Sequence, residues 1–206
     1  MKNPFSSQTY TRELWQNRTV GLLGGSFNPA HEGHRHISLY ALKMLGLDAV
    51  WWMVSPQNPL KSTKDMAPLE TRIASARAAS RHPKIHVTDI EQHLNTRYTT
   101  DTLRALQGHF PRTKFIWLMG TDNLRQIHRW QEWQEIFKMV PVCVLDRPPR
   151  HNAIKACPAA NRFRHYMLEQ AKAMTLKSAP LPAWTILHIP LNDMSATKIR
   201  AARRKS

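Results

Sequence analysis

The segment that most constrains this chain runs from a short apolar stretch, Val20 to Leu23, through two glycines and into two closely spaced histidines. Gly24-Gly25-Ser26-Phe27 follows the apolar stretch directly, and a helix-like segment extends from Arg35 to Leu45. A strand, a glycine turn and a helix start form a cradle for an anion, because free backbone N–H groups and the helix dipole both point at it. The sequence therefore predicts a phosphate site at this junction.

His31 and His34 lie three residues apart at the start of the expected helix. One helical turn brings residues at this spacing onto one face, so both imidazoles can act as donors beside a bound phosphate. A zinc site is the alternative, but the metalloprotease helix pattern needs histidines four residues apart with a glutamate next to the first. The second histidine arrives one residue early for that pattern. The spacing favours chemistry on a phosphate, and we assign no metal ligand.

Short apolar stretches alternate with helix-like segments along most of the chain. Such alternation is typical of right-handed βαβ units, which build a parallel sheet covered by helices on both faces. We therefore expect an α/β fold with a Rossmann-like, doubly wound parallel sheet, whose ligands bind beyond the carboxyl ends of the strands where the strand order reverses. Strands are expected at Val20–Leu23, Val50–Val54, Ile85–Val87, Phe115–Met119, Val140–Leu145 and Thr185–Ile189, and helices near Gly33–Leu45, Leu69–Ser80, Thr99–Gln107 and Gln131–Phe137.

The length of the chain favours a single domain. With 206 residues and 42% hydrophobic content, it can bury one substantial core. We expect an N-terminal extension over residues 1–18 and one domain over residues 19–206, with a peripheral helix around Asn161–Met174. No apolar run is long enough for a membrane span, and the first eighteen residues lack the apolar core of a signal peptide. Cys143 and Cys157 are too few for a disulfide framework or a metal cluster, so we expect cytoplasmic residence.

The chain is strongly basic. Thirty Lys and Arg residues against fourteen Asp and Glu residues give a net charge of +16, with clusters in residues 147–164 and 198–205. Such a charge is compatible with a solvated surface, with a field that attracts polyphosphate substrates, or with nucleic-acid binding. Because the sequence contains no zinc finger, no RNA-binding sheet motif and no arginine-rich tail, nucleic-acid binding is the weaker alternative.

Two motifs at opposite ends of the chain resemble one enzyme family. The first is the pattern Gly-Gly-x-Phe-x-Pro-x-His-x-Gly-His over residues 24–34. The second, Met194-Ser195-Ala196-Thr197-Lys198-Ile199-Arg200, is similar to a phosphate loop of the form Ile-Ser-Ser-Thr-x-Ile-Arg. Both are signatures of the HxGH nucleotidyltransferase superfamily. Three further segments resemble its bacterial nicotinate-nucleotide adenylyltransferase branch, namely residues 56–61, residues 98–103, and residues 120–124 with the downstream Trp130.

The resemblance implies a reaction between two nucleotides. The 5′-phosphate of nicotinate mononucleotide would attack the α-phosphorus of ATP, releasing pyrophosphate and leaving nicotinate adenine dinucleotide. Because this nucleophile is already an anion at neutral pH, the chain needs no general base and supplies positioning and charge stabilisation instead. Mg²⁺ would accompany ATP, held mainly by substrate phosphates and water. A sister adenylyltransferase that uses nicotinamide mononucleotide or phosphopantetheine stays open as an alternative.

On the ATP side, the resemblance implies that His31, His34 and Arg200 are the catalytic groups. The histidines would donate hydrogen bonds to oxygens that gain negative charge in the transition state. Arg200 would clamp pyrophosphate in a bidentate way that lysine cannot reproduce. The residues expected to bind ATP are Gly24, Gly25, Ser26, Phe27, Ser195, Thr197 and Arg200.

On the acceptor side, the resemblance implies a site for the mononucleotide built from Asn58, Lys61, Thr99, Asp122 and Trp130. Lys61 would pair with its phosphate, Asp122 would accept from a ribose hydroxyl, and Trp130 would stack on the pyridine ring. Backbone N–H groups near Thr99 and Trp130 would bind the nicotinate carboxylate. A core position is the alternative for Trp130, because Trp133 follows three residues later.

Two positions depart from the family pattern. Asn28 stands where aspartate is usual, which removes a charge but keeps a turn-forming side chain. Ala196 replaces the second serine of the phosphate loop and removes one hydroxyl that could bind phosphate. The sequence leaves the oligomeric state open.

Overall fold

A parallel β-sheet forms the centre of the molecule. The computed structural model describes residues 11–56, 66–146 and 157–190, and within them seven strands pair in the order β3-β2-β1-β4-β5-β7-β6, all parallel. The strands are β1 Thr19–Gly25, β2 Ala49–Val54, β3 Ile85–Thr88, β4 Lys114–Gly120, β5 Val142–Asp146, β6 Met167–Leu168 and β7 Trp184–His188.

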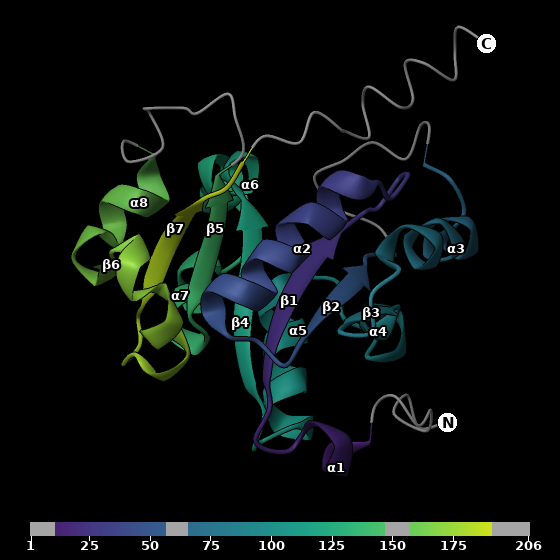
Figure 1. The fold of residues 1–206 in the computed structure, drawn as a ribbon, viewed down its shortest axis with the longest axis horizontal. Coiled ribbons are helices and arrows are strands. Elements are labelled where there is room, and N and C mark those ends of the chain that lie inside the picture. The colour runs from purple at the N-terminus through teal and green to yellow at the C-terminus, as the bar shows by residue number, and fades with distance from the viewer. Residues whose placement is uncertain (1–10, 57–65, 147–156, 191–206) are drawn as a thin grey trace, which may run out of the picture.

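The strand order reverses next to β1. From β1 the chain proceeds to β2 and β3 on one side, and then returns to place β4 and β5 on the other side (Figure 1). Leu22 of β1 therefore pairs with Trp51 of β2 on one side and with Trp117 of β4 on the other. This arrangement confirms the predicted doubly wound parallel sheet and places its switch point between β1 and β4.

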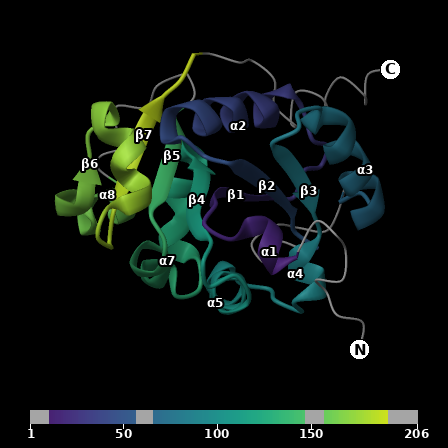
Figure 2. The same cartoon turned by 60° about the horizontal axis from the view of Figure 1, so that its bottom comes forward.

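Helices cover both faces of the sheet. Figure 2 shows α2 along one face and α5 and α7 on the other. The first face carries α2 Glu32–Leu45, α3 Leu69–Ser80 and the 3₁₀ helix η5 Gln170–Ser178. The second face carries α1 Arg12–Trp15, α4 Ile90–His93, α5 Thr99–His109, α6 Thr121–Gln126, η2 Ile127–Arg129, α7 Trp133–Met139 and α8 Pro158–Arg162. Within the three described ranges, no helix is both long and apolar enough to span a membrane.

The core consists of two apolar layers, one on each face of the sheet. Successive side chains of a strand point to opposite faces, so Trp51 packs in one layer and Trp52 in the other, both fully buried. Trp15 of α1 meets Trp51 edge-on with 5.0 Å between ring centroids. The residues just before β1 therefore contribute a large side chain to the core of the domain.

The expected helix around Asn161–Met174 is wrong. Helix α8 ends at Arg162, where Phe163 leaves helical geometry and its buried ring stacks on Phe137 with 4.3 Å between centroids. After a short 3₁₀ turn, η4 Arg164–Tyr166, the chain enters β6, which pairs with β7. Tertiary packing of an aromatic ring and pairing at the sheet edge thus override local helix propensity here.

Candidate active site

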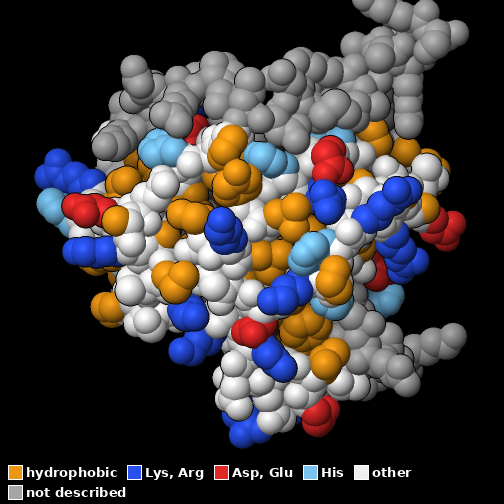
Figure 3. All heavy atoms as spheres, in the orientation of Figure 1, with side chains coloured by type: hydrophobic (Ala, Val, Ile, Leu, Met, Phe, Trp, Pro, Cys, Tyr) orange, Lys and Arg blue, Asp and Glu red, His pale blue; other side chains and the backbone are white. Residues whose placement is uncertain are grey.

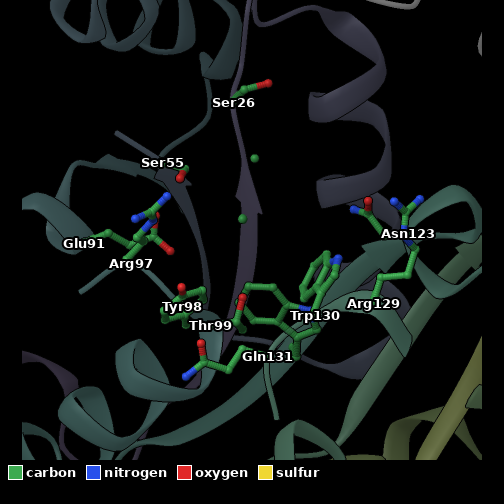
Figure 4. Close-up of a pocket in the computed structure, with 13 residues that line it drawn as sticks. Ser26, Ser55, Glu91, Arg97, Tyr98, Thr99, Asn123, Arg129, Trp130 and Gln131 are labelled. Atoms are coloured by element: carbon green, nitrogen blue, oxygen red, sulfur yellow. The ribbon is translucent and has the colours of Figure 1, made fainter. Parts of the chain in front are cut away.

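A pocket lies at the carboxyl ends of β1 and β2, near the switch point (Figure 4). One end of the pocket is formed by the last residues of β1 and the loop after it, and the other by the segment that precedes α5 and the turn that follows η2. Its lining residues are Gly24, Gly25, Ser26, Ser55, Glu91, Arg97, Tyr98, Thr99, Trp117, Asn123, Arg129, Trp130 and Gln131. The pocket occupies the position at which doubly wound sheets bind ligands.

The end of β1 and the loop that follows it pass very close to neighbouring side chains. A Cβ atom on Gly24 would lie 2.8 Å from Cη2 of Trp117, so only glycine fits there without a shift. Phe27 adopts a left-handed φ of 46°, and its buried ring stacks on Trp52 with 5.2 Å between centroids. This ring anchors the loop in the core, while Gly24 and Gly25 at the end of β1 and Ser26 after it line the pocket.

His31 and His34 cap the N-terminus of α2 reciprocally. The Nδ1 atom of His31, the N-cap residue, accepts a hydrogen bond from the Gly33 backbone N–H at 3.1 Å. The Nδ1 atom of His34 accepts from the His31 backbone N–H at 3.3 Å. A neutral imidazole that accepts at Nδ1 carries its proton on Nε2. Both rings, whose centroids lie 4.0 Å apart, are therefore set to donate through Nε2.

The two histidines lie beside the loop after β1. The ring of His34 is 4.7 Å from the ring of Phe27, and His31 is buried. Neither histidine belongs to the wall of the pocket itself, which Gly24, Gly25 and Ser26 form at this end. The predicted grouping of two imidazoles at the helix start is present in the structure, while their catalytic roles stay predictions.

Arg72 is a buried cation that the sequence reasoning missed. Its guanidinium donates to the backbone carbonyls of Ser26 at 2.8 Å, Ser55 at 2.7 Å, Pro56 at 2.9 Å and Ala67 at 2.9 Å. Burial lowers the pKa of Arg72 from its ordinary value. The side chain ties the loops after β1 and β2 to the segment before α3. It also places a positive charge behind the loop that would hold phosphates.

Asn28 also connects the loop after β1 to the segment before α3. Its Oδ1 atom accepts a hydrogen bond from the Ala67 backbone N–H at 3.3 Å. A neutral amide oxygen is sufficient for this contact, so the loss of charge relative to aspartate leaves the hydrogen bond between the loop after β1 and the segment before α3 in place.

Glu91 is a buried carboxyl group in the wall of the pocket. It belongs to α4, and only 8% of its surface is exposed. Burial raises the pKa of Glu91 to about 7, while a hydrogen bond with the Ser55 side chain acts in the opposite direction. The sequence reasoning missed this residue, because a four-residue helix leaves no periodic pattern to reveal which side is buried.

The acceptor end of the pocket combines tryptophan rings with a helix start. Trp130 follows η2, and its ring meets Trp117 edge-on with 6.4 Å between centroids. Thr99, which lines the pocket, is the first residue of α5, with Tyr98 as the N-cap. The N–H groups of the first turn of a helix have no partner within the helix and can therefore bind an anion. The structure thus brings Thr99 and Trp130 together, as the sequence predicted.

Other predicted site residues are placed differently. Asp122 on α6 is exposed and does not line the pocket, whereas its neighbour Asn123 does. Five further predicted residues lie outside the described residues: Asn58, Lys61, Ser195, Thr197 and Arg200. Ser55, Arg97 and Arg129 line the pocket without having been predicted. No cluster of three or more His, Cys, Asp or Glu side chains that could hold a metal ion occurs among the described residues.

Comparison with known proteins assigns the family. The cytidylyltransferase-like family model matches residues 22–202 of the chain. A Ruegeria pomeroyi protein is 49% identical over 185 residues, which cover 90% of this chain and 86% of the relative. A Cereibacter sphaeroides protein is 52% identical over 185 residues, which cover 90% of this chain and 98% of the relative. Both are named "Probable nicotinate-nucleotide adenylyltransferase". The chain belongs to the nicotinate-nucleotide adenylyltransferase family.

A solved structure from another organism has the same fold as this adenylyltransferase family member. Plasmodium falciparum nicotinic acid mononucleotide adenylyltransferase complexed with NaAD aligns with a TM-score of 0.67 at 16% identity. The alignment covers 89% of this chain and 83% of that chain. The likeness extends over most of the doubly wound sheet and its helices. Members of the adenylyltransferase family depend on ATP and generally use a divalent metal.

Proposed function

We propose that this chain transfers the adenylyl group of ATP to nicotinate mononucleotide, giving nicotinate adenine dinucleotide and pyrophosphate in NAD biosynthesis. The observation that carries the proposal is the two-ended pocket, which has Gly24, Gly25 and Ser26 at one end and the Trp130 ring beside the start of α5 at the other. The capped start of α2 lies next to the glycine end, outside the pocket wall. The names of the relatives that share about half of its residues point to the same reaction.

The reaction joins two anionic groups without a general base. An oxygen of the mononucleotide 5′-phosphate forms a bond to the α-phosphorus of ATP, and the bond between that phosphorus and the bridging oxygen breaks. Pyrophosphate leaves with this oxygen. Because the attacking phosphate is ionised at neutral pH, the chain has to align the two phosphates and offset their mutual repulsion.

His31 and His34 stabilise the charge that develops during the transfer. Capping bonds fix both rings with Nε2 as the donor atom, so neither ring has to reorient when the oxygens gain charge. The buried Arg72 guanidinium holds the Ser26 carbonyl from behind, and its charge adds to the positive field at the loop. Ser195, Thr197 and Arg200, which the motif assigns to the phosphates of ATP, complete the proposed site from outside the described residues.

A divalent cation such as Mg²⁺ would neutralise phosphate charge when bound. Because Mg²⁺ keeps several waters and favours substrate phosphates over an all-protein cage, we propose that it enters with ATP. We assign no residue of this chain to it.

Trp130 and Thr99 supply the proposed acceptor site. The indole face of Trp130 offers a flat surface for the pyridine ring, and Thr99, the first residue of α5, lines the same pocket. We keep Lys61 and Asn58 as candidates for the mononucleotide phosphate, and Asp122 as a candidate for its ribose. We also retain cytoplasmic residence as a prediction from the sequence.

Nucleic-acid binding is the second candidate function, because of the net charge of +16. On the face shown in Figure 3, Lys and Arg side chains are scattered among apolar and acidic side chains and do not gather in one stripe. A backbone-tracking site needs a continuous basic groove. The surface in view therefore favours the enzyme.

The test of the proposal is pyrophosphate release from Mg-ATP with nicotinate mononucleotide, nicotinamide mononucleotide or phosphopantetheine at equal concentration. Preference for the first supports the proposed reaction. Turnover with another acceptor would support adenylyl transfer from ATP and would overturn nicotinate mononucleotide as the acceptor substrate. If protein that is folded by circular dichroism released no pyrophosphate with any of the three acceptors, the proposed function would be overturned. Nucleic-acid binding would then be the favoured function.

A further inference from the structure

Arg97 places a guanidinium in the wall of the pocket to which neither motif nor mechanism gives a role. The residue belongs to the segment between α4 and α5 and directly precedes Tyr98, the N-cap of α5. Its side chain is exposed, and its contact within the described residues is with the Tyr98 ring, 6.0 Å from guanidinium carbon to ring centroid.

The N–H donors of Arg97 are not used by an acidic side chain of the described chain. The described arginines and lysines that form ion pairs are others, namely Arg18, Arg35, Arg104 and Lys138. A guanidinium carries five N–H donors in a planar fork that matches a carboxylate in a bidentate way. An exposed, unpaired fork at a pocket wall is therefore available to an anionic group of a ligand.

The charges around Arg97 favour an anion at this end of the pocket. Among the residues that the structure describes, the charged side chains that line the pocket are Arg97, Arg129 and Glu91. Glu91 is buried, and burial raises its pKa to about 7, so its repulsion of a nearby anion is reduced at neutral pH. The N-terminus of α5, an eleven-residue helix, adds partial positive charge beside Thr99.

The position of Arg97 separates it from the phosphate end of the pocket. Figure 4 shows Ser26 at one end, and shows Arg97 and Trp130 on facing walls with Tyr98 and Thr99 between them. Arg129 lies on the side of Trp130. A pyridine ring stacked on Trp130 would direct a ring substituent toward the segment of Arg97 to Thr99, while the 5′-phosphate would extend toward Ser26.

We propose that Arg97 is a specificity-determining residue whose guanidinium binds the carboxylate on the pyridine ring of the acceptor. The inference deepens the proposed function and rests on it. Backbone N–H groups at Thr99 can bind the oxygen of a carboxylate or of an amide, so they discriminate weakly between the two. A guanidinium gains a charge-assisted bidentate contact from the carboxylate and none of that charge from the amide. Arg97 therefore sets the preference for nicotinate mononucleotide over nicotinamide mononucleotide.

The experiment compares the full chain with its Arg97→Gln and Arg97→Lys variants at saturating Mg-ATP. We expect Arg97→Gln to lower kcat/KM for nicotinate mononucleotide by about ten- to a hundredfold, with a much smaller change for nicotinamide mononucleotide, so that the ratio between the two substrates collapses. Arg97→Lys keeps the charge but loses the fork, so it should fall between wild type and Arg97→Gln.

Arg77→Gln is the matched control, because it removes one positive charge from an exposed position on α3 outside the pocket. It should leave the substrate ratio as in wild type. An unchanged ratio in Arg97→Gln, or equal losses with both mononucleotides, would overturn the role of Arg97 while wild-type turnover leaves the proposed function standing. Wild-type protein that is folded and inactive with both mononucleotides would overturn the proposed function, and the inference with it.

Discussion

The backbone N–H of His31 donates to Nδ1 of His34 at 3.3 Å, while the two imidazole rings lie 4.0 Å apart at the start of α2. The same contact thus serves two purposes. It satisfies a backbone donor at the helix terminus, and it fixes the tautomer in which His34 presents Nε2–H. A structural role and a proposed catalytic role are therefore combined in one side chain.

Replacing His34 with alanine should separate these two roles. We expect kcat to fall by about a hundred- to a thousandfold, because one preorganised donor to the transition state is lost. The loss of the cap should lower the free energy of unfolding by only about 1 kcal/mol. Pyrophosphate release and urea denaturation measure the two effects. His82→Ala, in the segment between α3 and β3 and outside the pocket, is the control, because the Nδ1 atom of His82 also accepts from a backbone N–H, that of Lys84. Near-normal turnover of His34→Ala would remove His34 from the mechanism.

Replacing Trp130 with alanine should weaken acceptor binding selectively. Stacking of a ring on an aromatic side chain contributes about 1–3 kcal/mol, so KM for the mononucleotide should rise by about ten- to a hundredfold while KM for ATP changes little. Trp130→Phe keeps a ring and should recover most of the loss. Steady-state kinetics with each substrate varied in turn provides the measurement. A rise confined to KM for ATP would contradict the stacking role.

The fold was predictable because its signals are local. Buried parallel strands are continuous apolar runs, and the expected strands at Val20–Leu23, Val50–Val54 and Phe115–Met119 lie within β1, β2 and β4. Each expected strand is followed by glycine or polar residues, and β1 and β4 extend by one or two glycines beyond the apolar run. The expected bounds of the helix Leu69–Ser80 agree with α3. The short strand β6 was missed, because two residues at a sheet edge carry no pattern.

Parts of the site were not predictable, because they depend on contacts between distant segments. Arg72 is buried by carbonyl groups up to 46 residues away in sequence, and nothing in its neighbours distinguishes it from the exposed Arg77 on the same helix. Glu91 is positioned at the pocket by the short helix α4, and Arg97 by the irregular segment between α4 and α5. Thr99 and Trp130, in contrast, were found because the family motif carries them.

The buried carboxyl group of Glu91 should make stability depend on pH. Burial raises its pKa from 4.5 to about 7, so between these values the folded state binds more protons than the unfolded state. Stability therefore falls as pH rises through this window, by about 3 kcal/mol in total. Glu91→Gln should remove this decline and be more stable than wild type at pH 8. Thermal unfolding between pH 4 and pH 8 tests this, with the exposed Glu70→Gln as control. A decline of equal size in Glu91→Gln would assign the effect to other groups.

Replacing Arg72 with lysine should loosen the loops that form the phosphate end of the pocket. Lysine keeps the positive charge but has one compact ammonium group, which cannot donate to the carbonyls of Ser26, Pro56 and Ala67 together. Buried carbonyls left without donors cost about 1–3 kcal/mol each, so we expect the free energy of unfolding to fall by about 2–4 kcal/mol. Because Ser26 is then held less firmly, KM for ATP should rise as well.

The matched control for Arg72→Lys is Arg77→Lys on the exposed side of α3, which should change the free energy of unfolding by less than about 0.5 kcal/mol. Urea denaturation and ATP kinetics on both variants provide the comparison. If Arg72→Lys were as stable as Arg77→Lys, the four carbonyl contacts would not be holding the loops together. If stability fell while KM for ATP stayed constant, Arg72 would support the fold without shaping the phosphate end of the pocket, and the positive charge behind Ser26 would have no part in binding ATP.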